Sequence, residues 1–257
     1  MKRRLLNIKR GSITPIKSAI LPFNGGTTAN MIIATVDNSD WTINWGDGTL
    51  ETYPSDSGVF RTHTYASSFI GNVIIYGDVS YLRSSTGSYD FTNVVNFTNL
   101  DSLWLQNNQF TGNMSGVISL TSLTYLFLYS TQFTGNMTGV TGLTLLTTLR
   151  LNSNQFTGDM SGVSGLSLLT TLYLISNQFT YTYSLLSSGF VNFYIRLKSG
   201  ELSNPTDIDN ILIDIDNNTT SGGGTIDLRS TGAASPTAAS ASAVSSLISK
   251  GRTVLTN

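Results

Sequence analysis

The chain has 257 residues, a formal net charge of −1, no cysteine and one histidine. Only 11% of its residues are charged, and serine and threonine supply most of the polar side chains. These features exclude a general nucleic-acid or polyanion binder, a disulfide scaffold and a cysteine-ligated metal centre. No apolar run approaches the roughly 20 residues of a membrane-spanning helix. The length suits one large or two modest domains.

Residues 1–22 are basic, and no acidic residue precedes Asp37. The apolar runs at 5–8 and 18–22 are too short for the core of a secretion signal. We therefore expect a chain made in the cytoplasm, whose first 22 residues form an arm that docks on an acidic neighbour. The docking residues would be Lys2, Arg3, Arg4, Lys9 and Arg10. A tail without fixed structure is the alternative.

Residues 23–78 contain short alternating or apolar runs, each bounded by Gly, Asn, Asp or Pro. This pattern predicts a small unit of antiparallel strands. The strands are expected at Met31–Val36, Trp41–Trp45, Thr49–Tyr53, Val59–Tyr65 and Asn72–Tyr76. The pair Asp47-Gly48 lies between two of them and is typical of a hairpin turn, because glycine tolerates a positive φ.

Two motifs in this unit resemble the polycystic-kidney-disease-type (PKD) immunoglobulin-like domain. They are Trp45-Gly46-Asp47-Gly48-Thr49 and His63-Thr64-Tyr65. The usual Gly-Thr-Tyr before the last strand is replaced here by Ile70-Gly71-Asn72. The resemblance implies a β sandwich that acts as a spacer or adhesion module. Asp47 and His63 could form an acid–base pair, but we expect Asp47 to bond the backbone of its own turn instead.

The centre of the chain repeats with a period of 23 residues, which predicts a solenoid. Each repeat has a pair of leucines two positions apart, followed by an asparagine and then a phenylalanine. The leucine pairs are Leu103/Leu105, Leu126/Leu128, Leu149/Leu151 and Leu172/Leu174, and the phenylalanines are Phe110, Phe133, Phe156 and Phe179. Asn108, Asn154 and Asn177 hold the asparagine position, and Thr131 is the exception.

Residues 80–257 resemble the leucine-rich repeat family, as in the L-x-L-x-x-N-x-F-T-G unit that begins at Leu149. The resemblance implies one short parallel strand per repeat, with both leucines in the core. A buried asparagine can bond open backbone groups, so Thr131 should weaken one repeat without breaking the stack. The recurring Met114, Met137 and Met160 are expected to pack in the core or at its rim, and no cofactor or metal is expected.

The last residues are expected to cap the solenoid. Asn204 and Pro205 predict the start of a helix, followed by a strand at Thr225–Leu228. A second helix would begin at Ser235-Pro236, before a final strand at Thr253–Thr256. Its expected inward residues are Ala241, Val244, Leu247 and Ile248.

The predicted architecture is thus a PKD-like β sandwich followed by an α/β leucine-rich-repeat solenoid with a parallel sheet and a helix–strand C-terminal cap. The predicted boundaries are an arm at 1–22, a β domain at 23–78 and a repeat domain at 79–257. Within the repeat domain they are an N-terminal cap at 79–99, repeats at 100–198 and a C-terminal cap at 199–257.

The residues beside each leucine pair should face the concave side of the sheet. The predicted binding residues are Trp104, Phe127, Tyr129, Arg150, Tyr173 and Arg196, and Gln106, Asn152, Ile175 and Lys198 are expected to be exposed beside them. Several exposed aromatic residues are a poor solution for a monomer, which favours a binding face. The alternative is that these rings pack on one another or under the β unit.

Catalysis is not expected, because the chain has a single histidine and lacks nucleophile, phosphate-loop and dinucleotide motifs. The combination of motifs resembles bacterial surface repeat proteins and proteins of their bacteriophages. We expect a virion component, of decoration or fibre type, that docks through its N-terminal part. Its partners would be other virion proteins or a host surface protein or glycan, with a homo-oligomer as a further option. A bacterial cell-surface or secreted adhesin is the alternative, and an intracellular interaction scaffold is a third.

Overall fold

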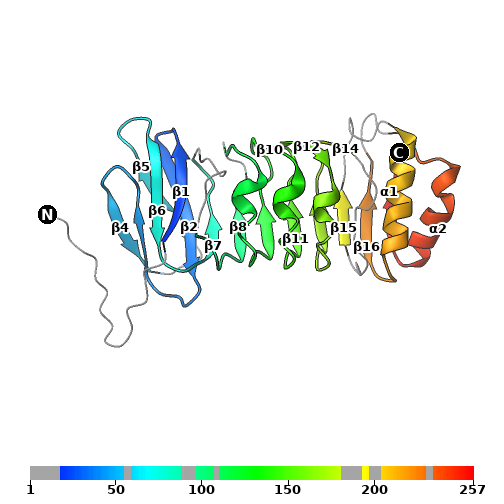
Figure 1. Ribbon diagram of the computed structural model, residues 1–257, viewed down its shortest axis with the longest axis horizontal. Helices are drawn as coiled ribbons and strands as arrows, with labels where there is room; N and C mark the ends of the chain where they lie inside the picture. The colour runs from blue at the N-terminus through cyan, green and yellow to red at the C-terminus, as the bar shows by residue number, and fades with distance from the viewer. Residues whose placement is uncertain are drawn as a thin grey trace.

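The structure is a computed structural model that describes residues 18–54, 59–87, 89, 96–106, 110–180, 193–196, 204–229 and 234–257, with the backbone alone at 180 and 193–196. The chain forms an elongated body, with antiparallel strands at one end and two helices at the other (Figure 1). The basic residues Lys2, Arg3, Arg4, Lys9 and Arg10 lie outside the described residues. Their docking role stays a prediction.

The described residues of the N-terminal part form seven strands. They are β1 (Ser18–Asn24), β2 (Thr28–Thr35), β3 (Trp41–Asn44), β4 (Leu50–Tyr53), β5 (Arg61–Thr64), β6 (Ile70–Tyr76) and β7 (Val79–Arg83). β1, β6, β3 and β4 form one antiparallel sheet in that order, and β2 lies between β5 and β7 in another. Both sheets contribute side chains to one buried core, where the Phe23 ring of β1 lies 5.2 Å from that of Tyr65. The resemblance to a PKD-type sandwich stays a prediction.

Strand β1 corrects the predicted extent of the basic arm. Residues 18–22 belong to the first strand, which pairs along its whole length with β6. Ala19, Leu21 and Phe23 alternate into the core, so burial of these side chains holds the segment in place. Pro22 is compatible with this position because β1 lies at the edge of its sheet, where a missing N–H breaks no internal ladder.

The repeats contribute short parallel strands to a ten-stranded sheet. These are β8 (Ser102–Trp104), β9 (Tyr125–Phe127), β11 (Thr148–Arg150), β13 (Thr171–Tyr173) and β15 (Phe193–Arg196). Each residue pairs with its equivalent in the next repeat, so Leu103 pairs with Leu126, and Leu149 pairs with both Leu126 and Leu172. The 23-residue period is therefore the strand-to-strand step of a parallel solenoid.

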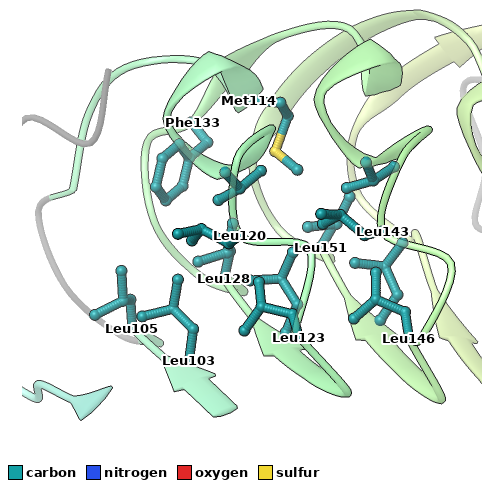
Figure 2. Close-up of a cluster of buried hydrophobic side chains, with 14 of the residues drawn as sticks. Leu103, Leu105, Met114, Leu120, Leu123, Leu128, Phe133, Leu143, Leu146 and Leu151 are labelled. Atoms are coloured by element: carbon teal, nitrogen blue, oxygen red, sulfur yellow. The ribbon is translucent and has the colours of Figure 1, made fainter. Parts of the chain in front are cut away.

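The opposite side of each repeat holds short strands and 3₁₀ helices. The strands are β10 (Thr134–Gly135), β12 (Gln155–Asp159) and β14 (Gln178–Thr180), and the 3₁₀ helices are η2 (Met114–Val117), η3 (Met137–Val140) and η4 (Ser161–Val163). Between the two sides lie the repeated leucines, as Figure 2 shows for Leu103, Leu128 and Leu151. Met114, Met137 and Met160 are also buried, which confirms their predicted packing role.

The phenylalanines form a second buried column. Neighbouring rings from Phe110 to Phe179 have centroids 6.0 to 6.4 Å apart and nearly parallel planes. The column continues into the N-terminal part, because Tyr89 stacks on Phe110 at 5.0 Å and contacts Phe23 edge-on at 5.0 Å. One row of aromatic rings thus joins the repeats to the N-terminal core.

The two predicted domains also share a sheet. β7 pairs antiparallel with β2 and parallel with β8, so the ten-stranded sheet runs without interruption across position 79. At the same junction the Asn99 side-chain amide donates to both carboxylate oxygens of Asp78, at 2.7 and 2.8 Å. The N-terminal β unit therefore covers the first edge of the solenoid.

The C-terminal cap contains α1 (Pro205–Asn218), β16 (Gly224–Asp227), η5 (Ala238–Ser240), α2 (Ala241–Ser249) and β17 (Thr253–Leu255). Asn204 caps α1 as predicted, since its side chain accepts a hydrogen bond from the Thr206 N–H at 3.0 Å. The second helix begins later than predicted, after a cap by Thr237. Of the residues predicted to face inward, Leu247 is buried and Val244 packs partly buried against the core, whereas Ala241 and Ile248 are exposed. Ala243 is buried as well.

Candidate binding surface

One column of side chains runs across the outer face of the parallel sheet, the face predicted to be concave. It consists of Arg83, Trp104, Phe127, Arg150 and Tyr173, one from each successive strand between β7 and β13. We call this set the Arg–aromatic column. Each member lies one position after a buried leucine, so strand alternation turns its side chain away from the core. All five side chains are half-buried.

The column is continuous, because each member contacts the next. The Trp104 and Phe127 ring centroids are 4.6 Å apart. The Arg150 guanidinium lies over both the Phe127 ring, at 5.1 Å, and the Tyr173 ring, at 4.7 Å. At the other end, the Arg83 guanidinium lies 5.7 Å from the Trp104 ring centroid. Both predicted arrangements are therefore present together: the rings pack on one another and stay on the outer face.

Flanking positions widen this surface. Tyr129 is half-buried beside Phe127 on the same face, and so are Asn152 and Ile175. Gln106 is predicted to be exposed, but only 9% of its surface is accessible in the structure. Arg196 pairs with Tyr173 in strand register, which continues the column by one position. The side chain of Arg196 and the whole of Lys198 lie outside the described residues.

Sequence reasoning missed the first members of this surface. Arg83 was assigned to a cap, yet its strand β7 is the first parallel neighbour of β8. Tyr81 lies on the same strand and contacts Trp104, with ring centroids 5.8 Å apart. The Phe60 ring of the N-terminal part lies 5.4 Å from the Arg83 guanidinium. The sequence did contain a signal for this strand, because Tyr81-Leu82-Arg83 resembles the strand segment of a repeat. Leu82 precedes its equivalent Leu103 by 21 residues, however, and the repeat period is 23.

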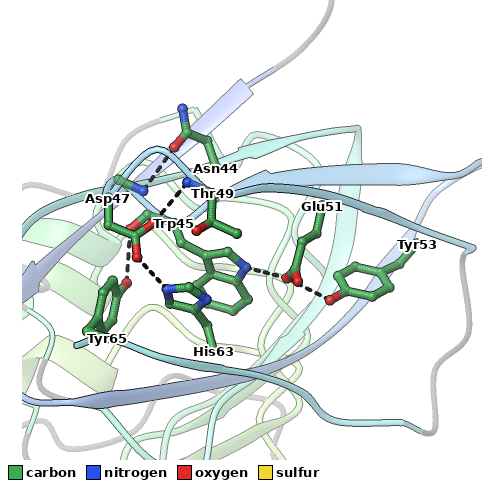
Figure 3. Close-up of polar contacts among 9 residues, drawn as sticks. Asn44, Trp45, Asp47, Thr49, Glu51, Tyr53, His63 and Tyr65 are labelled. Carbon is green, nitrogen blue, oxygen red and sulfur yellow. Dashed lines mark hydrogen bonds and ion pairs between the residues drawn. The ribbon is translucent and has the colours of Figure 1, made fainter.

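Asp47 and His63 form a structural cluster at the hairpin turn (Figure 3). Asp47 Oδ1 accepts from the Thr49 N–H at 2.9 Å, which confirms the predicted turn bond, and Oδ2 lies 2.8 Å from His63 Nε2. Burial alone would raise the pKa of Asp47, but the bonds from Thr49 and His63 together hold it below its ordinary value. The His63 ring stacks on Trp45 at 5.0 Å, and the Tyr65 hydroxyl donates to the Trp45 carbonyl oxygen at 2.9 Å. These bonds fix the turn.

Glu51 completes the cluster on the other side of Trp45. Its Oε2 accepts from Trp45 Nε1 at 2.6 Å and from the Tyr53 hydroxyl at 2.7 Å. Burial, followed by the neighbouring Glu51 carboxylate, raises the pKa of Tyr53 to about 12, so its hydroxyl remains a donor. Within the described part of the chain, no group of three or more His, Asp or Glu side chains is arranged to hold a metal ion. No described helix has the length and hydropathy to cross a membrane.

Comparison with known proteins gives similarity to solved structures only. No protein-family model matches the sequence, and no curated protein matches it. Internalin C2 of Listeria monocytogenes is 30% identical over 40% of this chain and 43% of its own, with a TM-score of 0.33. An internalin (inlF) of the same species is 25% identical over 62% and 48%, with a TM-score of 0.34.

The third similar structure is from a plant. It is the leucine-rich-repeat ectodomain of the Arabidopsis thaliana receptor kinase GASSHO1/SCHENGEN3, in complex with CASPARIAN STRIP INTEGRITY FACTOR 2. It is 18% identical over 69% of this chain and 26% of its own, with a TM-score of 0.38. The matched regions span less than half of each of these three solved structures. The strand register described above shows that the repeats of this chain form a parallel solenoid.

Proposed function

We propose that this protein is a non-enzymatic binding or adhesion protein and that the Arg–aromatic column is its binding surface. The observation that carries the proposal is the unbroken contact chain from Arg83 to Tyr173 on the outer face of the sheet. Aromatic and arginine side chains dominate binding energy at protein interfaces. The contacts along the column also fix the rotamers of long side chains before binding, which lowers the entropy cost of association.

The strand geometry makes this surface stiff. The column spans five parallel strands spaced by about 4.8 Å, so it covers about 19 Å across a hydrogen-bonded sheet. A rigid surface of this length, built from aromatic rings and two arginines, suits a hydrogen-bonded and apolar contact with an elongated partner. We therefore place a bacterial cell-surface or secreted adhesin first among the functions considered.

The virion component is the second candidate. It depends on docking by the basic arm, whose residues lie outside the described part of the chain. The structure sharpens its test, because β1 begins at Ser18 and a clean deletion must stop at Lys17. Loss of incorporation into phage particles on removal of residues 1–17 would favour the virion component. Normal incorporation of the truncated chain would contradict arm docking.

The binding proposal is tested by selecting ligands from a random-peptide display library and from a glycan array on the immobilised full chain. Binders should lose affinity by about tenfold or more when Trp104→Ala or Phe127→Ala is introduced, as for central aromatic residues at interfaces. Leu168→Ala is the matched control, because Leu168 is 51% exposed and does not belong to the column. Circular dichroism verifies that each variant is folded. Binders that respond equally to all three changes would contradict the proposal.

A further inference from the structure

The outer face of the parallel sheet is positively charged between β7 and β13. Its charged side chains are Arg83 and Arg150, and neither forms an ion pair with any carboxylate in the described part of the chain. The carboxylate of Asp101, just before β8, already accepts two hydroxyl hydrogen bonds. Asp159 caps the 3₁₀ helix η4 on the other side of the core, where it accepts from the Ser161 N–H at 2.9 Å. Neither guanidinium is therefore neutralised by a carboxylate among the described residues, and that of Arg83 lies beside the Tyr81 hydroxyl.

Hydrogen-bond donors also exceed acceptors along the column. The indole Nε1 of Trp104 and the Nε atoms of Arg83 and Arg150 are buried and have no hydrogen-bond partner among the described residues. Buried donors without partners cost free energy, which a partner rich in acceptors can recover after small side-chain adjustments. This excess of donors again favours an anionic ligand.

The packing of the aromatic rings favours a peptide ligand over a glycan ligand. A sugar ring needs a free aromatic face, but the Phe127 ring is contacted by Trp104 at 4.6 Å and by the Arg150 guanidinium at 5.1 Å. With neighbours on both sides, the Phe127 ring offers a partner mainly its edge, which carries partial positive charge. Edges of this kind suit carbonyl and carboxylate oxygens. The arrangement favours an extended acidic peptide over a stacked carbohydrate.

We infer that the Arg–aromatic column binds an extended peptide segment with two acidic residues four positions apart, one on Arg83 and one on Arg150. This inference rests on the proposed function and specifies its ligand. Three strand-to-strand steps separate the two arginines, which is about 14 Å. An extended peptide rises about 3.3 Å per residue, so positions i and i+4 are about 13 Å apart. They also point to the same side, because side chains alternate along an extended chain.

The same spacing assigns the residue between the two acids. Position i+2 points to the same side and falls midway between the arginines, over the Trp104–Phe127 pair. An apolar side chain at this position would bury surface against the two rings. The recognised pattern is therefore acid, any residue, apolar, any residue, acid.

The test uses labelled nine-residue peptides and the full chain. The matching peptide has glutamates at positions 3 and 7 and leucine at position 5 in a serine background. One control moves the second glutamate to position 6, which keeps composition and charge but turns it to the opposite side. The other replaces both glutamates by glutamine. We expect the matching peptide to bind about tenfold or more tightly than either control, as expected for a charge-assisted hydrogen bond.

Protein variants assign the two contacts. Arg83→Gln and Arg150→Gln should each weaken the matching peptide by about ten- to hundredfold and remove the advantage over the position-6 control. Lys250→Gln is the charge-matched control at the C-cap of α2, and circular dichroism checks its folding, because Lys250 also pairs with Asp216 at 2.7 Å. Because the peptide changes leave the protein untouched, the comparison stands even if one arginine variant fails to fold.

Three results would overturn the inference. They are equal binding of the position-6 and matching peptides, unchanged binding by both arginine variants, and no binding of the matching peptide up to about 1 mM. Arginine-dependent binding of polygalacturonate in place of the peptides would identify an acidic glycan as the ligand instead. Each of these results leaves the proposed function standing if display-selected ligands still depend on Trp104, and that dependence is measured separately.

Discussion

Asn177 donates from its side-chain Nδ2 to the carbonyl oxygen of Leu151, one repeat earlier, at 2.9 Å. The same Nδ2 donates to Leu174 of its own repeat at 2.9 Å, and its Oδ1 accepts from the Phe156 N–H at 3.2 Å. One buried amide thus joins two repeats through three backbone groups. Asn154 bonds the preceding repeat in the same way, through Leu128 and Phe133.

Replacing Asn177 by alanine should lower the free energy of unfolding by about 3 kcal/mol, because buried backbone groups lose their partners. Asn177→Thr should cost clearly less. The chain already has threonine at the equivalent position 131, where the hydroxyl donates to the Leu128 carbonyl oxygen at 2.9 Å. Urea denaturation followed by circular dichroism measures both changes. Equal losses for alanine and threonine would contradict this role of the side-chain bonds.

Gly139 lets neighbouring 3₁₀ helices approach closely. A Cβ atom at this position would lie 2.0 Å from the Met114 carbonyl oxygen of the preceding repeat. Gly139→Ala should therefore force the backbones apart and cost about 2–3 kcal/mol. Gly142→Ala is the control, because a Cβ there would have no atom within 4 Å, and its effect should stay within about 0.5 kcal/mol. Thermal unfolding compares them, and a similar melting temperature for both would contradict the packing argument.

The Asp47–His63 bond should make the N-terminal unit sensitive to acid. Since the pKa of Asp47 is lowered in the folded state, its stabilisation is present at neutral pH and is lost as the pH falls below about 4. Asp47→Asn should be about 1 kcal/mol less stable than the wild type at pH 7, and the gap should be smaller at about pH 3. Urea midpoints at both pH values measure the difference. A constant gap would show that the charge on Asp47 has no part in it.

Asp209 of α1 joins the two cap helices. Its carboxylate accepts from the Thr237 N–H at 2.8 Å, from the Thr237 hydroxyl and from the Ser240 hydroxyl at 2.6 Å. Asp209→Asn should cost about 2 kcal/mol, because an amide has one acceptor oxygen in place of two. Asp207→Asn on the same helix should cost less than about 1 kcal/mol through the helix dipole alone. Faster amide hydrogen exchange in α2 should accompany only the change at Asp209; unchanged exchange there would contradict the contact.

The structure of the repeated part of the molecule follows from the amino-acid sequence alone. Each repeat of 23 residues carries a leucine pair, an asparagine and a phenylalanine. Because these residues recur at the same spacing, each repeat places the same side chains in the same environment. The parallel strand register, the buried phenylalanine column and the side-chain bonds of Asn154 and Asn177 follow from that identity. Asn204 likewise determined the start of α1, because a capping side chain acts within its own turn.

The contacts between segments of unlike sequence could be seen only in the folded structure. The pairing of β1 with β6 joins residues more than 45 positions apart, and neither strand reveals its partner locally. The shared strand β7, the contact of Phe60 with Arg83 and the close approach at Gly139 arise the same way. The spacing predicted which residues share the outer face. The spacing did not predict that Trp104 and Arg150 would pack against the Phe127 ring. These contacts depend on side-chain rotamers, which are set by packing between repeats of different sequence. They matter because they determine which ligand the outer face suits.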